Sequence, residues 1–210
     1  MEATRILAIR HGETAWNVDT RIQGHLDIPL NDTGRRQARR LAEAVAGEEL
    51  AAVYASDLAR ACETAQALAH GAGVEVVRHD GLRERAFGAF EGLTFAEIEA
   101  RWPEQALRWR RRDPDFASEG GETLSAFYAR CVATASALAS CHRGRQIALV
   151  SHGGVMDCLY RAATRADLAA PRTWRLGNAS INRLLHTPQG FSLVGWSDTQ
   201  HLERETLDEA

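Results

Sequence analysis

The stretch that decides the fold covers residues 6–12, Ile-Leu-Ala-Ile-Arg-His-Gly, in which an unbroken apolar run ends in a histidine and a glycine. A second apolar run at 147–150, Ile-Ala-Leu-Val, continues into Ser-His-Gly-Gly at 151–154. Short continuous apolar runs are typical of strands buried on both faces of a parallel sheet. We therefore predict two central strands, each with a histidine directly after its carboxyl end.

Helical and strand patterns alternate outward from these two runs. Apolar residues recur at helical spacing after residues 32–33 and 56–57, where Asp32 or Thr33, and then Ser56 or Asp57, are expected to cap the helices. Further strands are predicted at 50–55, 74–77, 180–186 and 191–196, and further helices at 95–101, 103–111, from Thr123 onward and after Gly154.

This alternation predicts a single α/β domain over residues 1–210, with a mostly parallel sheet and a late hairpin. Residues 93–119 are interpreted as a short insertion that helps to determine specificity. The polar tail at 203–210 is expected to be frayed.

The chain contains no lysine, so its 25 basic residues are all arginine, against 28 acidic residues and a formal charge of −3. Schiff-base catalysis on a lysine amine is therefore excluded, and so is a Gly-Lys-Ser/Thr phosphate loop. Any phosphate that this protein binds must be held by arginine, by histidine or by backbone N–H groups.

Composition also limits the partners and the compartment. The slightly acidic balance argues against nucleic acid or an anionic membrane as partner, and no apolar run approaches the ~18 residues of a membrane span. The four cysteines form no Cys-x-x-Cys pair and are interpreted as free thiols. Because the first residues also lack the pattern of a signal peptide, we expect a cytoplasmic protein.

The ends of the predicted strands indicate a phosphate site. Ligands of open α/β sheets bind beyond the carboxyl ends of the strands, so His11 and His152 are expected to share one crevice. Gly153 opens a helix, whose free N–H groups favour an anion. Arg60 lies in the first turn of another helix, where a cation is unfavourable unless an anion offsets it. Together with Arg10, these residues predict a site for a dianionic phosphate.

A carboxylate near the phosphate would complete proton transfer. Glu84 is the candidate, since it lies in a loop at 81–92 that begins and ends with glycine. On the residues alone, Glu13, Glu91 and Glu122 compete with it.

A series of motifs occurs in order along the chain. They are Arg-His-Gly-Glu-Thr at 10–14 with Trp16-Asn17, Arg-Ile-Gln-Gly at 21–24, Ser-Asp-Leu-Ala-Arg-Ala at 56–61, Leu-Arg-Glu at 82–84 with Phe-Gly at 87–88, Gly-Gly-Glu-Thr at 120–123 and Val-Ser-His-Gly-Gly at 150–154. The ordered set covers residues 5 to about 185 and resembles the histidine phosphatase superfamily, also called the phosphoglycerate mutase-like family. The resemblance implies a doubly wound α/β fold, with helices on both faces of the sheet, and a phosphohistidine mechanism.

The resemblance also implies a role for each candidate residue. His11 would be the nucleophile, and Glu84 the general acid and then the general base. Arg10, Arg60 and a charged His152 would keep His11 neutral and neutralise the phosphoryl oxygens. The residues expected to bind the substrate are Thr14, Asn17, Gln23, Gly24 and Gly153. No metal and no cofactor is required, because arginine and histidine supply the positive charge.

Within this family, the resemblance favours a phosphatase over a cofactor-dependent mutase. The mutases usually carry a longer insertion with a lysine and an arginine pair, whereas residues 93–119 are short and contain no lysine. The run Arg110-Arg111-Arg112 could imitate that pair, but we interpret it as a solvated helix face.

Two other classes of function fit these residues less well. A metal-dependent hydrolase would use His11, His152 and carboxylates as ligands, but no His-x-His or His-Glu-x-x-His spacing supports it. A non-catalytic binder of phosphorylated ligands would be expected to lack His11 or Glu84. We therefore predict a phosphomonoester hydrolase that acts on a small phosphorylated metabolite. The state of assembly stays open, with a homodimer as the candidate.

Overall fold

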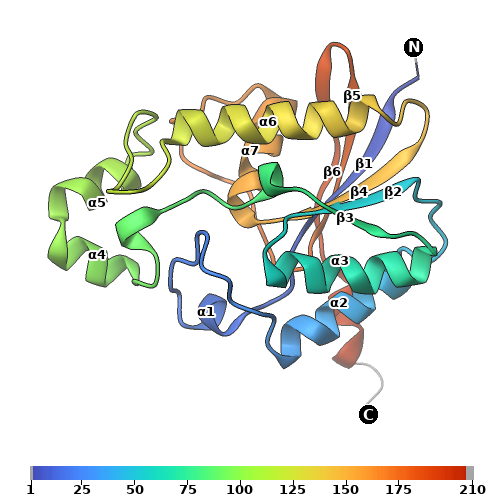
Figure 1. The fold of residues 1–210 in the computed structure, drawn as a ribbon, viewed down its shortest axis with the longest axis horizontal. Coiled ribbons are helices and arrows are strands. Elements are labelled where there is room, and N and C mark those ends of the chain that lie inside the picture. The colour runs from blue at the N-terminus through green and yellow to red at the C-terminus, as the bar shows by residue number, and fades with distance from the viewer. Residues whose placement is uncertain (1, 207–210) are drawn as a thin grey trace.

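A six-stranded sheet forms the centre of the molecule, which we describe over residues 2–206 of a computed structural model (Figure 1). The strands are β1 (Thr4–Arg10), β2 (Ala52–Ala55), β3 (Val76–Arg78), β4 (Gln146–Ser151), β5 (Ile181–Thr187) and β6 (Gly190–Asp198). Their spatial order is β3-β2-β4-β1-β5-β6. The pairs β1–β4, β2–β4 and β2–β3 are parallel, and β5 and β6 form the antiparallel hairpin.

The two predicted central strands are neighbours. β1 pairs with β4 in a register that sets Arg10 opposite Ser151, so His11 and His152 follow adjacent strand ends. The two histidines therefore lie at one edge of the sheet, as predicted, although only His11 lines the cavity at that edge, where we expected both. Most of the chain lies between His11 and His152 in sequence. The pairing of β1 with β4 nevertheless brings the two residues close together.

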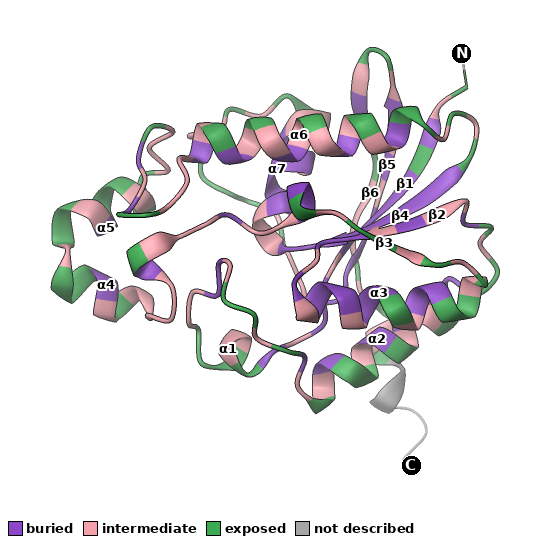
Figure 2. Cartoon of the chain, in the orientation of Figure 1, coloured by how far each residue is buried: buried purple, intermediate pink, exposed green. Residues whose placement is uncertain are grey.

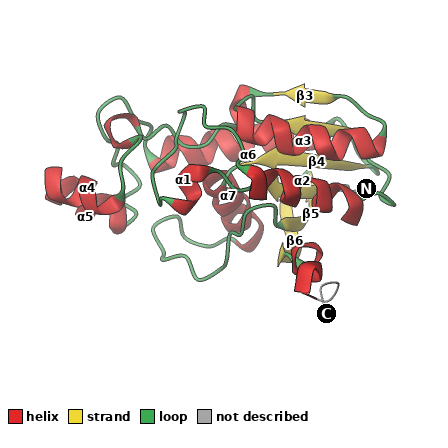
Figure 3. Cartoon of the chain, turned by 90° about the horizontal axis from the view of Figure 1, so that it is seen from below, coloured by secondary structure: helices red, strands yellow, loops and turns green. Residues whose placement is uncertain are grey.

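Helices cover both faces of the sheet (Figures 1 and 3). The α-helices are α1 (Ala15–Val18), α2 (Asp32–Ala44), α3 (Ala59–Ala72), α4 (Phe95–Arg101), α5 (Pro103–Arg110), α6 (Leu124–Ser140) and α7 (Gly153–Thr164). Two apolar clusters separate the layers, one against α2 and α3 and the other against α6 and α7. The predicted α/β fold with helices on both faces is confirmed.

The unbroken apolar run of β1 serves both clusters. Ile6 and Ala8 pack toward α6 and α7, whereas Leu7 and Ile9 pack toward α2 and α3. Side chains alternate across a strand, so a strand covered on both faces needs apolar residues at every position. The central strands are accordingly buried along most of their length (Figure 2).

Three local predictions were wrong. Asn31, not Asp32 or Thr33, caps α2, because its side chain accepts a hydrogen bond from the Gly34 N–H. Helix α3 has Leu58 as its N-cap residue and no side-chain cap, because the Asp57 carboxylate is paired with Arg83 at 2.6 Å. The strands before and after this helix, β2 and β3, each begin two residues later than the patterns at 50–55 and 74–77 predicted.

The insertion and the tail lie in different parts of the molecule (Figure 1). Helices α4 and α5 project beyond the end of the sheet and enclose a satellite apolar cluster around Phe90, Ile98 and Phe116 (Figure 1). The backbone of Gln200–Thr206 forms a 3-10 helix, and residues 207–210 of the predicted frayed tail lie outside the described residues. Over the described part of the chain, no helix has both the length and the apolar character needed to cross a membrane.

Candidate active site

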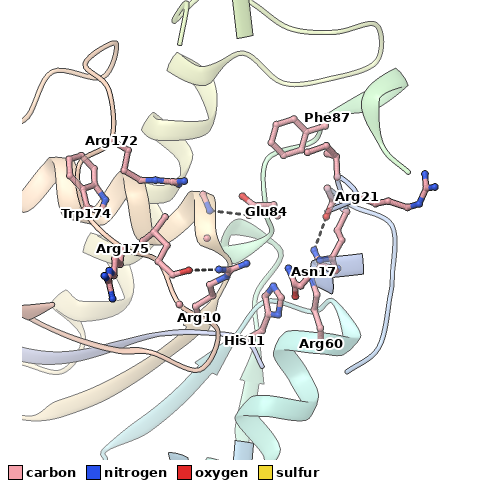
Figure 4. Close-up of a pocket in the computed structure, with 17 residues that line it drawn as sticks. Arg10, His11, Asn17, Arg21, Arg60, Glu84, Phe87, Arg172, Trp174 and Arg175 are labelled. Carbon is pink, nitrogen blue, oxygen red and sulfur yellow. Dashed lines mark hydrogen bonds between the residues drawn. The ribbon is translucent and has the colours of Figure 1, made fainter. Parts of the chain in front are cut away.

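A cavity of about 490 Å³ opens at the carboxyl ends of β1 and β4 (Figure 4). Of the sequence-predicted site residues, eight line it: Arg10, His11, Asn17, Gln23, Gly24, Arg60, Glu84 and Gly153. They come from strand ends, from helix starts and from the loops at 21–24 and 82–84. The predicted residues are thus brought together from segments far apart in the sequence.

His11 is held in one orientation and one tautomer. Its Nδ1 donates to the Gly12 carbonyl at 2.6 Å, which leaves Nε2 with a free lone pair. Burial, together with the positive charges of Arg60 and Arg10, holds the pKa of His11 well below 6.5. His11 is therefore a neutral imidazole at pH 7, the state that a nucleophile requires.

Arg60 is a buried cation and Arg10 a half-buried one, and neither has a carboxylate partner among the described residues. Arg60 is 1% exposed and donates to the carbonyls of Gly24 (2.8 Å) and Leu26 (2.9 Å), while Arg10 donates to the Leu176 carbonyl. Burial lowers the pKa of Arg60 to about 10, so it stays charged. Within residues 2–206 neither arginine forms an ion pair, and the Nε of each has no hydrogen-bond partner. Such a pair of cations suits an anionic ligand.

His152 lies behind the cavity wall rather than in it. Its side chain is fully buried, and its ring centroid is 5.2 Å from that of His11 in an edge-to-face arrangement. Neither ring nitrogen has a partner in the described part of the protein. Burial first, and then the charge of Arg60, holds the pKa of His152 well below 6.5. The prediction of a charged His152 is therefore wrong, because a fully desolvated imidazole beside arginines stays neutral.

Glu84 reaches the start of α7. Its Oε2 accepts from the Gly154 N–H at 3.0 Å, and its Oε1 accepts from the Arg85 N–H at 2.9 Å. A Cβ on Gly154 would stand 2.1 Å from Glu84 Oε1, so only glycine permits this approach. One of the helix N–H groups that we expected to bind phosphate is thus occupied by the carboxylate itself.

The three competing carboxylates serve other contacts. Glu13 accepts from the Asn31 side chain at 2.9 Å, and Glu122 pairs with Arg130 at 2.9 Å. Glu91 accepts from two backbone N–H groups, those of His25 and Phe87. None of the three lines the cavity, so the geometry favours Glu84 as the proton donor and acceptor.

Thr14 is the predicted substrate-binding residue that the structure places elsewhere. It is fully buried at the N-cap of α1, where its Oγ1 accepts from the Asn17 N–H, and it does not line the cavity. Its role is to position Asn17. Asn178 contributes as well, since its Nδ2 donates to the carbonyls of His11 and Gly12 and to Asn17 Oδ1. With Oδ1 engaged in this way, the Asn17 amide N–H groups are left for a ligand.

Sequence reasoning missed the residues that hold the Glu84 loop. Ser151 Oγ donates to the Leu82 carbonyl at 2.6 Å, and His25 Nε2 donates to the Glu84 carbonyl at 2.8 Å. Arg130 on α6 donates to the carbonyls of residues 81, 83 and 84. These contacts join segments distant in sequence. Of the residues that hold the loop, only Ser151 lies in one of the motifs, so the sequence could have indicated only that one.

Two aromatic and two cationic side chains of the cavity wall were not named as site residues from the sequence, although Phe87 lies in one of the motifs and the loop near 172–180 was expected to contribute to specificity. They are Phe87, Trp174, Arg172 and Arg175. The last three lie between α7 and β5, in a segment without periodicity or motif. Within the described residues, no group of three or more His, Cys, Asp or Glu side chains is arranged to hold a metal ion.

Comparison with known proteins agrees with this geometry. Residues 6–199 match the model of the histidine phosphatase superfamily, branch 1. The chain is 40% identical to phosphoglycerate mutase-like protein 4 of Arabidopsis thaliana, covering 97% of this chain and 89% of that protein. It is 36% identical to a metal-independent phosphoserine phosphatase of the same plant, covering 96% and 84%.

Solved structures show the same architecture. A mycobacterial glucosyl-3-phosphoglycerate phosphatase in complex with VO3 superposes with a TM-score of 0.84 at 33% identity, covering 93% of this chain and 99% of that one. A phosphoserine phosphatase of Entamoeba histolytica in complex with 3-phosphoglyceric acid gives 0.85 at 29% identity, covering 95% and 99%. The chain belongs to the histidine phosphatase superfamily, branch 1.

Proposed function

We propose that this protein is a phosphomonoester hydrolase that acts through a phosphohistidine on a small phosphorylated metabolite. The observation that carries the proposal is the state of His11. The Nδ1 of His11 donates to the Gly12 carbonyl. Burial and the positive charges of Arg60 and Arg10 lower its pKa. A neutral imidazole beside unpaired cations is suited to attack a phosphate dianion.

In the first step, the lone pair of His11 Nε2 forms a bond to phosphorus. The phosphorus–oxygen ester bond breaks, and the leaving oxygen takes a proton from the Glu84 carboxyl. In the second step, water attacks the phosphohistidine and gives a proton to the Glu84 carboxylate. The phosphorus–nitrogen bond breaks, inorganic phosphate leaves, and both side chains return to their starting states.

The surrounding groups stabilise the transferring phosphoryl group. Arg10 and Arg60 face its oxygens with positive charge, and the Gly153 N–H at the start of α7 adds a backbone donor. We assign Asn17 and Gln23 as amide contacts to the phosphoryl oxygens. We assign the neutral His152 as a donor of one ring N–H to the phosphoryl group. This hydrogen bond would give a partner to a nitrogen that is otherwise buried without one.

The ion pairs formed by the arginine run at 110–112 favour hydrolysis over mutase activity. Arg110 pairs with Glu99 at 3.0 Å, and Arg112 pairs with Asp157 at 2.6 Å. Arg110 and Arg111 are exposed as expected, but Arg112 is half-buried, so the prediction of a wholly solvated face is wrong there. Both arginines thus already have carboxylate partners, and neither lines the cavity around His11.

Trapping the intermediate tests the mechanism. Incubation with a ³²P-labelled phosphomonoester is expected to label the protein at His11, with a bond that is labile to acid and stable to alkali. His11→Ala should abolish the label and lower kcat/KM by roughly a thousandfold or more. The exposed His70 supplies the control, because His70→Ala should leave both unchanged.

The assays are run with a chelator, and a second assay follows the transfer of phosphoryl groups between phosphoglycerates with bisphosphoglycerate present. Turnover by His11→Ala would contradict the mechanism, and inhibition by the chelator would favour a metal-dependent hydrolase. Strong mutase turnover with negligible release of phosphate would replace hydrolysis by the mutase alternative.

We further propose a cytoplasmic location, supported by the four cysteines, all of which are free thiols. Fractionation of cells followed by detection of the native chain tests this location. Recovery in an oxidising compartment, with the cysteines disulfide-bonded, would contradict it. A homodimer stays a prediction, which the mass of the native protein in solution can test.

A further inference from the structure

The loop at 81–84, which carries Glu84, lies outside the sheet, and side chains bind its backbone carbonyls. Arg130 on α6 donates to the carbonyls of residues 81, 83 and 84. Ser151 Oγ donates to the remaining carbonyl, that of residue 82, at 2.6 Å. Because backbone acceptors away from water need a partner, these side chains take the place of a neighbouring strand. The conformation of the loop therefore depends on them.

Arg130 uses its whole guanidinium group in this position. Its Nη1 donates to the carbonyls of residues 81 and 83, both at 3.0 Å, and its Nη2 donates to that of Glu84 at 3.2 Å. Its Nε and Nη2 also donate to the two carboxylate oxygens of Glu122, at 3.0 and 2.9 Å. The side chains of this ion pair are 26% and 19% exposed, so water competes little for these bonds. Five hydrogen bonds within the described residues thus use the five N–H donors of the guanidinium.

Glu122 is itself bound to the segment that follows Glu84. Its backbone N–H donates to the Ala86 carbonyl at 2.9 Å, and its own carbonyl accepts from Arg85 Nε at 2.8 Å. Glu122 therefore fixes Arg130 through its side chain and the residues after Glu84 through its backbone. One pair of charged residues holds the loop before and after the proton donor.

The position of this loop determines where the Glu84 carboxyl lies. A proton donor must be within hydrogen-bond reach of the ester oxygen, and a displacement of roughly 1 Å can lower a rate by about a hundredfold. Neither Arg130 nor Glu122 lines the cavity around His11. An effect of this pair on catalysis therefore acts through the loop and not through a contact with the substrate.

We propose that Arg130, oriented by Glu122, is a positioning residue of the reaction, which fixes the proton donor Glu84 by binding three of the four carbonyls of its loop. Arg130 itself transfers no proton and binds no substrate. The planar guanidinium suits this role, because its donors lie in a rigid fork that can reach several acceptors at once. The proposal rests on the phosphomonoesterase activity proposed above and adds a residue that acts through Glu84.

A series of para-substituted phenyl phosphates of similar size tests this role. Arg130→Ala should lower kcat/KM for p-methoxyphenyl phosphate by about tenfold to a hundredfold, because this poor leaving group needs the proton from Glu84. The loss for p-nitrophenyl phosphate should be less than about threefold, since its oxygen leaves without a proton. Inhibition by inorganic phosphate should stay unchanged, because the phosphoryl site is intact.

A double-mutant cycle shows whether Arg130 acts through Glu84. In the Glu84→Gln background, Arg130→Ala should lower kcat/KM by less than about threefold for every ester, because the group that it positions is already lost. Methylguanidinium added to Arg130→Ala should restore part of the activity on p-methoxyphenyl phosphate. Arg130→Lys should retain less than the wild type, because an ammonium has three donors where the guanidinium has five.

Arg183→Ala is the matched control. Arg183 forms a two-bond ion pair with Glu48 at 2.7 and 3.0 Å, and neither residue lines the cavity around His11. This variant should lose stability without a change in the dependence on the leaving group. If Arg130→Ala does not fold, Arg130→Lys and Glu122→Gln are compared with the control in the same series.

The exchange of two backbone amides reports the position of Glu84 without any turnover. The N–H groups of Arg85 and Gly154 donate to the Glu84 carboxylate, so both should exchange faster with solvent in Arg130→Ala and unchanged in Arg183→Ala. An equal kinetic loss for all leaving groups, or an undiminished loss in the Glu84→Gln background, would overturn the proposal. Faster exchange in a protein whose wild type hydrolyses no ester would uphold the positioning of Glu84 and refute the phosphatase activity instead.

Discussion

At the scale of single residues, burial leaves the histidines of the site neutral and its arginines positively charged. Desolvation disfavours the charged form of both histidine and arginine. Burial holds the pKa of both histidines well below 6.5, so they are neutral, whereas it lowers the pKa of Arg60 only to about 10, so this side chain is still charged at pH 7. One physical effect thus yields both a neutral nucleophile and the cations that stabilise the group it attacks.

The first prediction concerns Glu84. Glu84→Gln keeps an oxygen acceptor for the Gly154 N–H but removes the transferable proton, so kcat/KM should fall by about a hundredfold to ten-thousandfold. The loss should be smaller for an ester with a good leaving group, such as p-nitrophenyl phosphate, because that oxygen leaves without a proton. Steady-state kinetics over a series of leaving groups measures the effect.

Glu119→Gln is the control for this variant, since Glu119 is exposed and does not line the cavity around His11. An equal loss at Glu84→Gln across all leaving groups would argue against a proton donor. It would indicate that Glu84 only fixes the start of α7.

At the scale of elements, a buried ion triad fastens the segment between α7 and β5. Asp157 on α7 pairs with Arg161 at 3.0 Å and with Arg112 at 2.6 Å. Arg161 donates to the carbonyls of Asp167 and Ala170, and Arg112 donates to that of Leu168. The segment that carries Arg172 is thereby attached both to a core helix and to the insertion.

Asp157→Asn tests this attachment. The variant leaves two arginines, one of them fully buried, without their carboxylate, and breaking a buried pair costs about 3 kcal/mol or more of the free energy of unfolding. We also expect a raised KM with a smaller change in kcat, because the segment borders the cavity but not the reacting atoms. Urea denaturation and steady-state kinetics measure the two effects.

The exposed Asp115 provides the matched control, and Asp115→Asn should change neither quantity appreciably. An unchanged KM for Asp157→Asn, together with a loss of stability, would show that the triad serves the fold alone.

At the scale of the whole molecule, burying two histidines in the site makes the fold sensitive to acid. The pKa of His11 and that of His152 are both held well below 6.5 in the folded chain. As pH falls through 6.5, the unfolded chain binds protons on these residues and the folded chain does not. The free energy of unfolding must therefore decrease as pH falls, and it recovers at higher pH.

Denaturation between pH 7.5 and roughly pH 5 measures this slope. His142, His186 and His201 also have lowered pKa values and contribute to it. His11→Asn and His152→Asn should each reduce the slope by up to one proton. If neither variant changed the slope, these histidines would be protonated in the folded protein, and a neutral His11 would be wrong.

The sequence determined the layered fold and most of the site. Continuous apolar runs identified the central strands because a strand covered on both faces can carry no polar position. The rule for open sheets then placed the residues at their ends at one edge of the sheet, without any contact being known, although His152 lies behind the cavity wall rather than in it. Helix periods predicted α2, α3, α6 and α7, since an amphipathic pattern is local information.

Only the tertiary structure decided the rest. The choice of Glu84 over Glu13, Glu91 and Glu122, and the buried role of Thr14, depend on contacts between residues distant in sequence. The neutral state of His152 likewise depends on burial that no local pattern records. Arg172 and Trp174 lie in a segment without periodicity, and only the structure places both on the cavity wall. Charge state and proximity are properties of the folded environment, because desolvation and Coulomb interactions depend on separation in space and not along the chain.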